Sequence, residues 1–179
     1  MRHAILGTTL FFGLIGSAAA AVNCASLPNN TVNNFVNDDV VAIGITCTIG
    51  PSGSVNGSVT QTGDGGLVIR GVVNGSVSEA GPGDVVLARG ARIAGDVSEA
   101  DGGNIAVRGG ASMDGAVEES GDGSVNVTVD VPGLVKGNIY ENGNGGVTVN
   151  ALAGSFEGAV SEPGRGNVAV SVGFGLSFK

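Results

Sequence analysis

The strongest constraint in this sequence is a repeat of about 20 residues that runs through most of the chain. In each unit a β-branched residue follows the first glycine by two positions, a Glu or Gln by four, a second glycine by eight, and aliphatic residues by ten and twelve. The first glycines are Gly57, Gly75, Gly95, Gly115, Gly137 and Gly158. Such a period is typical of solenoids, whose units bury their apolar faces only by stacking on one another.

The spacing within a unit predicts three short strands. The pattern Gly-x-Val-x-Glu alternates with period 2, as in a strand with one inward face. The glycine pair that follows, such as Gly63 and Gly65, is expected to supply positive φ in a tight turn. Two aliphatic residues then indicate a second strand, and segments such as 91–95 a third. The stretch before the third strand varies in length between units, so we expect it to be an outer loop.

These units predict an all-β fold, a single right-handed parallel β-helix of about seven coils of 18–22 residues. One further coil is expected upstream, where Val41, Ile43, Ile45 and Cys47 alternate. A β-sandwich of hairpins is the alternative, but sandwiches do not keep so regular a register. The expected organisation is a signal peptide at 1–21, an N-terminal cap at 22–40, β-helix repeats at 41–172 and a C-terminal cap or tail at 173–179.

Residues 1–21 have the pattern of a secretory signal. A basic start, Met1 to His3, precedes an apolar run at 4–15 and small residues at 17–21. The run is too short to span a bilayer as a stable helix. No later segment has an apolar run long enough to span a membrane, so no transmembrane segment is expected in the mature chain. We predict a secreted, extracellular or cell-surface protein, with the periplasm as the alternative.

The mature chain contains two cysteines, Cys24 and Cys47. In an exported protein this most simply predicts one disulfide, although two inert thiols are the alternative. The bond would hold the Asn-rich segment 22–40 on the first coil as a cap, because an open coil exposes unpaired backbone. At the other end, Phe174, Leu176 and Phe178 would either cover the last coil or form an adhesive end.

The chemistry available to the mature chain argues against catalysis. The one histidine of the sequence, His3, lies in the expected signal, so the mature chain contains none. This excludes a His-based triad and most zinc sites. We therefore predict that the protein is not an enzyme and has no cofactor, apart from weak Ca²⁺ binding. The net charge of −8 argues against nucleic acid as a partner.

One row of residues could carry a function. Gln61 begins it, and five carboxylates continue it at the same position of successive units: Glu79, Glu99, Glu119, Glu141 and Glu162. Stacked about 5 Å apart, these groups would repel, which would raise their pKa values or retain cations between them. The functional hypothesis is a cation- or pH-responsive ladder. The structural alternative, which the sequence favours, is a corner position whose side chain faces water or bonds the following glycine turn.

Two repeat patterns resemble known families. The segments 90–97 (Gly-Ala-Arg-Ile-Ala-Gly-Asp-Val) and 110–117 (Gly-Ala-Ser-Met-Asp-Gly-Ala-Val) resemble bactofilins and related polymer-forming β-helix proteins. This resemblance, which covers about 41–172, implies a scaffold that polymerises end to end, although bactofilins are typically intracellular and this chain has a signal. The segments 162–169 and 99–106 resemble curlin repeats more weakly, since Glu replaces Gln in five units and like charges in register oppose fibril stacking.

These observations favour a secreted or cell-surface structural protein that self-associates through its coil ends. The alternatives are an adhesin-like module that binds a glycan or cell-surface partner through one solenoid face, and a curli-like amyloid subunit. The scattered basic residues Arg70, Arg89, Arg92, Arg108 and Arg165 are expected in outer loops, where they offset some acidic charge.

Overall fold

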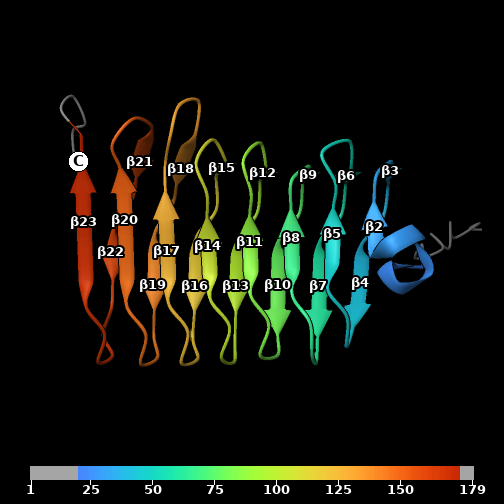
Figure 1. The fold of residues 1–179 in the computed structure, drawn as a ribbon, viewed down its shortest axis with the longest axis horizontal. Coiled ribbons are helices and arrows are strands. Elements are labelled where there is room, and N and C mark those ends of the chain that lie inside the picture. Colours follow the sequence, from blue (N-terminus) through green and yellow to red (C-terminus); the bar gives the residue numbers. More distant parts are fainter. Residues whose placement is uncertain (1–19, 174–179) are drawn as a thin grey trace, which may run out of the picture.

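The computed structural model describes residues 20–173 and has the predicted fold, an all-β parallel solenoid (Figure 1). It has about eight turns rather than seven, because residues 22–36 also contribute one strand to each sheet. The expected signal peptide lies outside the described residues except for positions 20 and 21. Phe174, Leu176 and Phe178 of the expected C-terminal cap or tail also lie outside them. Among the described residues, no helix has the length and apolar character needed to cross a membrane.

Three parallel sheets run along the rod, with one strand per turn in sheets A and B and one in each of the first seven turns in sheet C. Sheet A contains β1 Val22–Asn23, β4 Val40–Ile43, β7 Val59–Thr62, β10 Val77–Ala80, β13 Val97–Glu99, β16 Val117–Glu119, β19 Ile139–Glu141 and β22 Val160–Ser161. Sheet B contains β2 Thr31–Val32, β5 Cys47–Ile49, β8 Leu67–Ile69, β11 Val85–Leu87, β14 Ile105–Val107, β17 Val125–Thr128, β20 Val147–Ala151 and β23 Val168–Val172. Sheet C contains β3 Phe35–Val36, β6 Ser54–Val55, β9 Val72–Val73, β12 Arg92–Ile93, β15 Ser112–Met113, β18 Leu134–Lys136 and β21 Ser155–Glu157.

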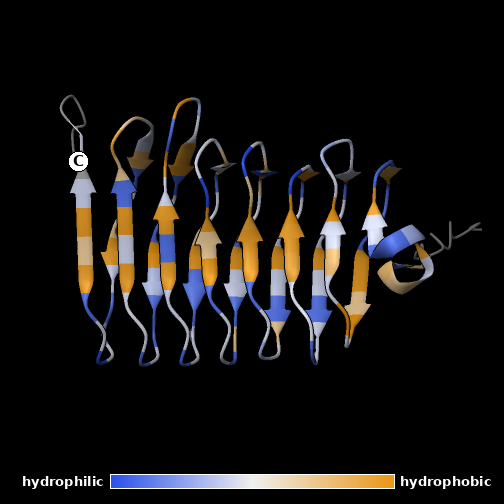
Figure 2. Ribbon diagram, in the orientation of Figure 1, coloured by the Kyte–Doolittle hydropathy of each residue, from blue (hydrophilic) through white to orange (hydrophobic). Residues whose placement is uncertain are grey.

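The repeat frame sets the register of the sheets. Val77 pairs with Val59 on one side and with Val97 on the other, so equivalent positions of successive units stack directly. The inward positions of all three sheets form one apolar core of fully or nearly fully buried side chains, such as Val85 and Met113. Figure 2 shows mainly hydrophobic residues (orange) along the middle strands of sheet B, and a mixture of hydrophobic and hydrophilic residues (orange and blue) along sheet A. Loops of variable length connect sheet B to sheet C, as predicted.

The glycine turns between sheets A and B differ from the expectation. Of the glycines predicted to need positive φ there, only Gly63 and Gly65 have it. The others are required for space: a Cβ on Gly83 would overlap the carbonyl oxygen of Gly65, and one on Gly145 would overlap that of Gly123. At these glycines successive coils therefore approach through their backbones, and the carbonyl oxygen of the preceding coil occupies the place of a Cβ.

The two ends of the rod are unequal. Two short 3-10 helices, η1 Cys24–Ser26 and η2 Pro28–Asn30, lie against the N-terminal end (Figure 1). The predicted Cys24–Cys47 disulfide is present, with the two Cα atoms 6.0 Å apart, and Leu27 packs on the core. At the other end, β22 and β23 each pair with one strand only within the described chain.

Candidate functional site

The glutamate row lies inside the solenoid. Glu79, Glu99, Glu119 and Glu141 are 0% exposed, as is Gln61 at the head of the row. Each follows an inward Val or Ile of sheet A by two residues, so strand alternation turns both side chains to the same face. The expectation that these glutamates face water is wrong for all four, and only Glu162, in the last coil, is partly exposed.

The turn that follows each glutamate supplies hydrogen bonds to one carboxylate oxygen. Glu119 Oε1 accepts from the backbone N–H of Gly121 at 2.7 Å and of Gly123 at 3.3 Å. The amides of Asp101, Gly143 and Gly166 likewise donate to Oε1 of Glu99, Glu141 and Glu162, at 3.0, 2.7 and 3.1 Å. The bond to the glycine turn, one of the alternatives set out above, is therefore present in four of the units. Each of these hydrogen bonds holds the turn between sheets A and B from the inner side of the solenoid.

The second oxygen of each buried glutamate has no such donor. Within the described chain no hydrogen bond reaches Oε2 of Glu99, Glu119 or Glu141, either oxygen of Glu79, or Oε1 of Gln61. The side-chain amide of Gln61 donates to the carbonyl oxygens of Gly63 and Ile45, at 3.0 and 3.5 Å. A buried acceptor without a donor costs about 1–3 kcal/mol, and more when it is charged.

Burial changes the acidity of two members of the row. It is the main cause that raises the pKa of Glu79 from 4.5 to about 7, reinforced by the close approach of the Glu99 side chain and by its charge. Burial also raises the pKa of Glu119 to about 8, although its hydrogen bonds from the turn amides oppose the rise. Contacts with the Glu141 and Glu99 side chains add to the rise in the pKa of Glu119. Desolvation rather than charge repulsion is thus the leading cause.

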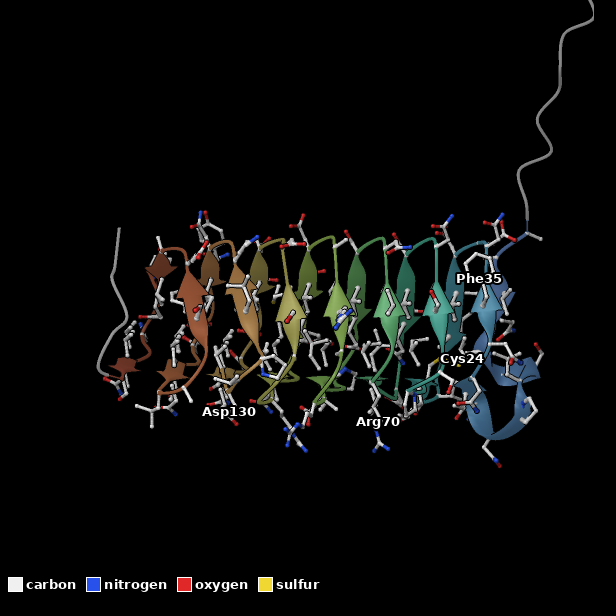
Figure 3. All side chains as sticks on the ribbon, turned by 90° about the horizontal axis from the view of Figure 1, so that it is seen from above. Cys24, Phe35, Arg70 and Asp130 are labelled. Carbon is white, nitrogen blue, oxygen red and sulfur yellow. A yellow bond between two sulfur atoms is a disulfide. The ribbon has the colours of Figure 1, made fainter. Side chains whose placement is uncertain are left out.

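The other charged residues do not join the row. Within residues 20–173, no three His, Cys, Asp or Glu side chains are placed to hold a metal ion together. The five arginines within residues 20–173 are exposed, and Figure 3 shows Arg70 directed away from the rod. The one ion pair in this part of the chain joins Lys136 Nζ to Asp114 Oδ1 at 3.6 Å on the surface. The buried carboxyls therefore have no basic side chain as a partner.

Sequence reasoning missed two surface ladders that hold neighbouring coils in register. In the first, the Asn74 side-chain amide donates to Asn56 Oδ1 at 3.2 Å, and that of Asn56 donates to Asn37 Oδ1 at 3.3 Å. The Asn-Gly pair at the first two unit starts, Asn56-Gly57 and Asn74-Gly75, was the available signal.

In the second ladder, a side-chain oxygen just before a strand accepts the backbone N–H of the equivalent residue in the next coil. Asp39 accepts from Ser58 at 2.7 Å in this way, and Asp96 accepts from Ala116 at 2.8 Å. Asp84 accepts from Asn104 at the start of a sheet B strand, also at 2.8 Å. Ser, Asp and Asn are frequent one position and nine positions after the first glycine of each unit. This recurrence was the signal in the sequence for the second ladder.

Comparison of the chain with known proteins found no match. No protein-family model matches the chain, and no curated protein or solved structure matches it. The resemblances to bactofilins and curlin repeats therefore stay predictions from the residues quoted above, and function has to be argued from this structure alone.

Proposed function

We propose that this chain is an exported structural protein, a rigid rod that associates with a second copy of itself through its C-terminal coil. The observation that carries the proposal is the exposure of inward positions in that coil. Val168 and Val170 are 49% and 40% exposed, whereas the residues they stack on, Val147 and Val149, are 0% exposed. A further coil would bury them, and the same coil of a second copy presents the same exposed valines.

Within residues 20–173, the outer edges of β22 and β23 have no partner strand, which supports the same proposal. The edges of β22 and β23 offer N–H and C=O groups, which readily pair with another strand. The N-terminal end is less available, because η1, η2 and the disulfide lie over it. Val32 and Val40 near that end are only 2% and 0% exposed.

Unequal ends favour a closed dimer over a filament. Head-to-tail growth needs both ends free, whereas association of two C-terminal ends closes after two copies. This modifies the end-to-end polymer that the bactofilin resemblance implies. It also opposes the curli-like alternative, in which each added unit would have to pair with the covered N-terminal end.

Export is part of the proposal and rests on separate observations. The disulfide is compatible with an extracellular or periplasmic location, and positions 1–21 have the pattern of a secretory signal. A non-enzymatic role agrees with a mature chain that contains no histidine and with a candidate site that is closed to substrate.

The test is the mass of the mature chain by light scattering over a range of protein concentrations. We expect a monomer–dimer equilibrium that Val170→Asp shifts to monomer, because a charge would be buried at the joint. Ile43→Asp is the matched control: Ile43 is 71% exposed near the other end, and its change should leave the equilibrium unaltered. A monomer at every concentration would refute the proposal and favour the adhesin-like alternative, and long fibres would refute the closed dimer.

A further inference from the structure

The interior carboxyl row has more acceptors than donors. Each of Glu99, Glu119 and Glu141 uses one oxygen on the turn amides and leaves the other enclosed without a donor. Glu79 leaves both oxygens without one, and Gln61, the polar residue at the head of the row, leaves its Oε1. Nearly all buried polar atoms in proteins have a hydrogen-bond partner. The other groups of residues 20–173 supply no such donor to this row.

The surroundings of the row contain no compensating charge in the described part of the chain. The strands of sheet B that face it present Leu67, Val85, Ile105, Val125 and Val147, all 0% exposed and apolar. Sheet C likewise presents Val73, Ile93, Met113 and Val135.

The titratable groups nearest the row are themselves acidic. Asp64, Asp101 and Asp122 lie in the following turns and are exposed, and Asp101 acts to raise the pKa of Glu79. Glu118 shares β16 with Glu119 but is exposed on the outer face, and Glu162 continues the row at the open end. The one basic residue in these turns is Arg165, which is exposed in the last coil beyond the buried members.

The register brings the carboxyls within reach of one another. Glu79 pairs with Glu99, Glu99 with Glu119, and Glu119 with Glu141. Neighbouring strands of a sheet are about 4.8 Å apart, so stacked carboxyls can contact one another directly. A proton on one carboxyl then donates to its neighbour, as in the carboxyl pairs that share a proton elsewhere in proteins.

We propose that the row is a buried proton-binding site, in which Glu79 and Glu119 carry the protons and donate them along the row. The Glu119 hydroxyl donates to Oε2 of Glu99 or of Glu141, and the Glu79 hydroxyl donates to Oε2 of Glu99 or to Oε1 of Gln61. Alternate members thus act as donors and the members between them as acceptors. The raised pKa values of Glu79 and Glu119, which are alternate members, agree with this order.

The site makes the solenoid's stability depend on pH. The unfolded chain releases these protons near the ordinary pKa of 4.5, while the folded chain holds them to about 7 and about 8. Unfolding therefore becomes easier as the pH rises through this range, and the contribution is complete in acid. This inference is independent of self-association, because it concerns the interior of a single copy.

The direct test is a titration of the side-chain carboxyl ¹³C resonances of the seven glutamates in the mature chain. We expect two of them to titrate with midpoints near pH 7 to 8, and Glu119→Gln and Glu79→Gln to assign them. Midpoints for all seven within about one unit of the ordinary value would overturn the proposal. This measurement needs only the wild-type protein, so it decides the matter even where a variant does not fold.

The second test is the unfolding constant in urea from about pH 5 to about pH 8. We expect it to rise more than about a hundredfold in the wild type, since one pKa unit is a factor of ten, and at least about tenfold less in Glu119→Gln. Glu118→Gln, on the outer face of the same strand, is the control and should match the wild type. The same pH profile in the wild type and both variants would overturn the proposal. A profile that changes when calcium replaces chelator would also overturn it, because a cation rather than a proton would then occupy the row.

Discussion

Alanine substitutions at two adjacent glycines of one turn should have very different effects on stability. Gly103 is buried, and a Cβ on it would overlap the carbonyl oxygen of Gly83 in the preceding coil. Gly102 is exposed, and a Cβ on it would meet nothing within 4 Å. Neither residue has positive φ, so the two positions differ in space and not in backbone conformation.

The magnitudes follow from that difference. Inserting a methyl group into a tightly packed interior typically costs about 1–3 kcal/mol, and Gly103→Ala should reach the upper part of this range because rigid backbone receives it. Gly102→Ala should be neutral or stabilising by about 0.4–1 kcal/mol, since alanine lowers the entropy of the unfolded chain. For a domain of this size about 1 kcal/mol corresponds to about 2–4 °C in Tm.

The assay is urea and thermal unfolding of both variants beside the wild type, followed by circular dichroism. We expect Gly103→Ala to unfold at a clearly lower urea concentration with a similar slope, and Gly102→Ala to overlay the wild type. Equal destabilisation by the two variants would refute the reasoning, because it would mean that conformational freedom, and not the close approach of coils, requires these glycines.

Three further predictions concern the disulfide, the core and the acidic row. Reducing Cys24–Cys47, which closes a separation of 23 residues, should cost about 3 kcal/mol; an unchanged Tm with reductant would contradict this. Ile105→Ala, at a 0% exposed position between β11 and β17, should cost about 2–5 kcal/mol in urea unfolding, whereas the exposed Thr128→Ala should change it little. Glu119→Gln should be more stable than wild type above about pH 8 by up to several kcal/mol, at about 1.4 kcal/mol per pKa unit; lower stability there would contradict the protonated row.

The sequence predicts the solenoid well because the repeat and the strand alternation are both local patterns. Val77, Val97 and Val117 recur at matching positions, and stacking is the one arrangement that buries them together. The disulfide was predictable for a similar reason, since two cysteines allow one pairing. The eighth turn was missed because β1 to β3 are two residues long and the 3-10 helices interrupt their repeat.

The site was harder to predict because two rules conflict at the same positions. Strand alternation places Glu79 on the same face as Val77, but charged residues are rarely buried, and the second rule carries the greater weight when only the sequence is known. The proposed protons on Glu79 and Glu119 would lessen the conflict, since burying a neutral carboxyl costs less than burying a charged one. Contact distances between coils, such as that at Gly83, are also absent from the sequence, and so positive φ was the only explanation available for those glycines.

The most direct test of the proposed end-to-end association is the shape of the mature protein in solution, measured by small-angle X-ray scattering over a concentration series. About eight turns at about 4.8 Å each give a rod of about 40 Å. We predict that the longest dimension approaches about 80 Å, twice that of one rod, at high concentration while the cross-section stays constant. A longest dimension that stays at that of a single rod, or a cross-section that doubles, would contradict association through the C-terminal coil.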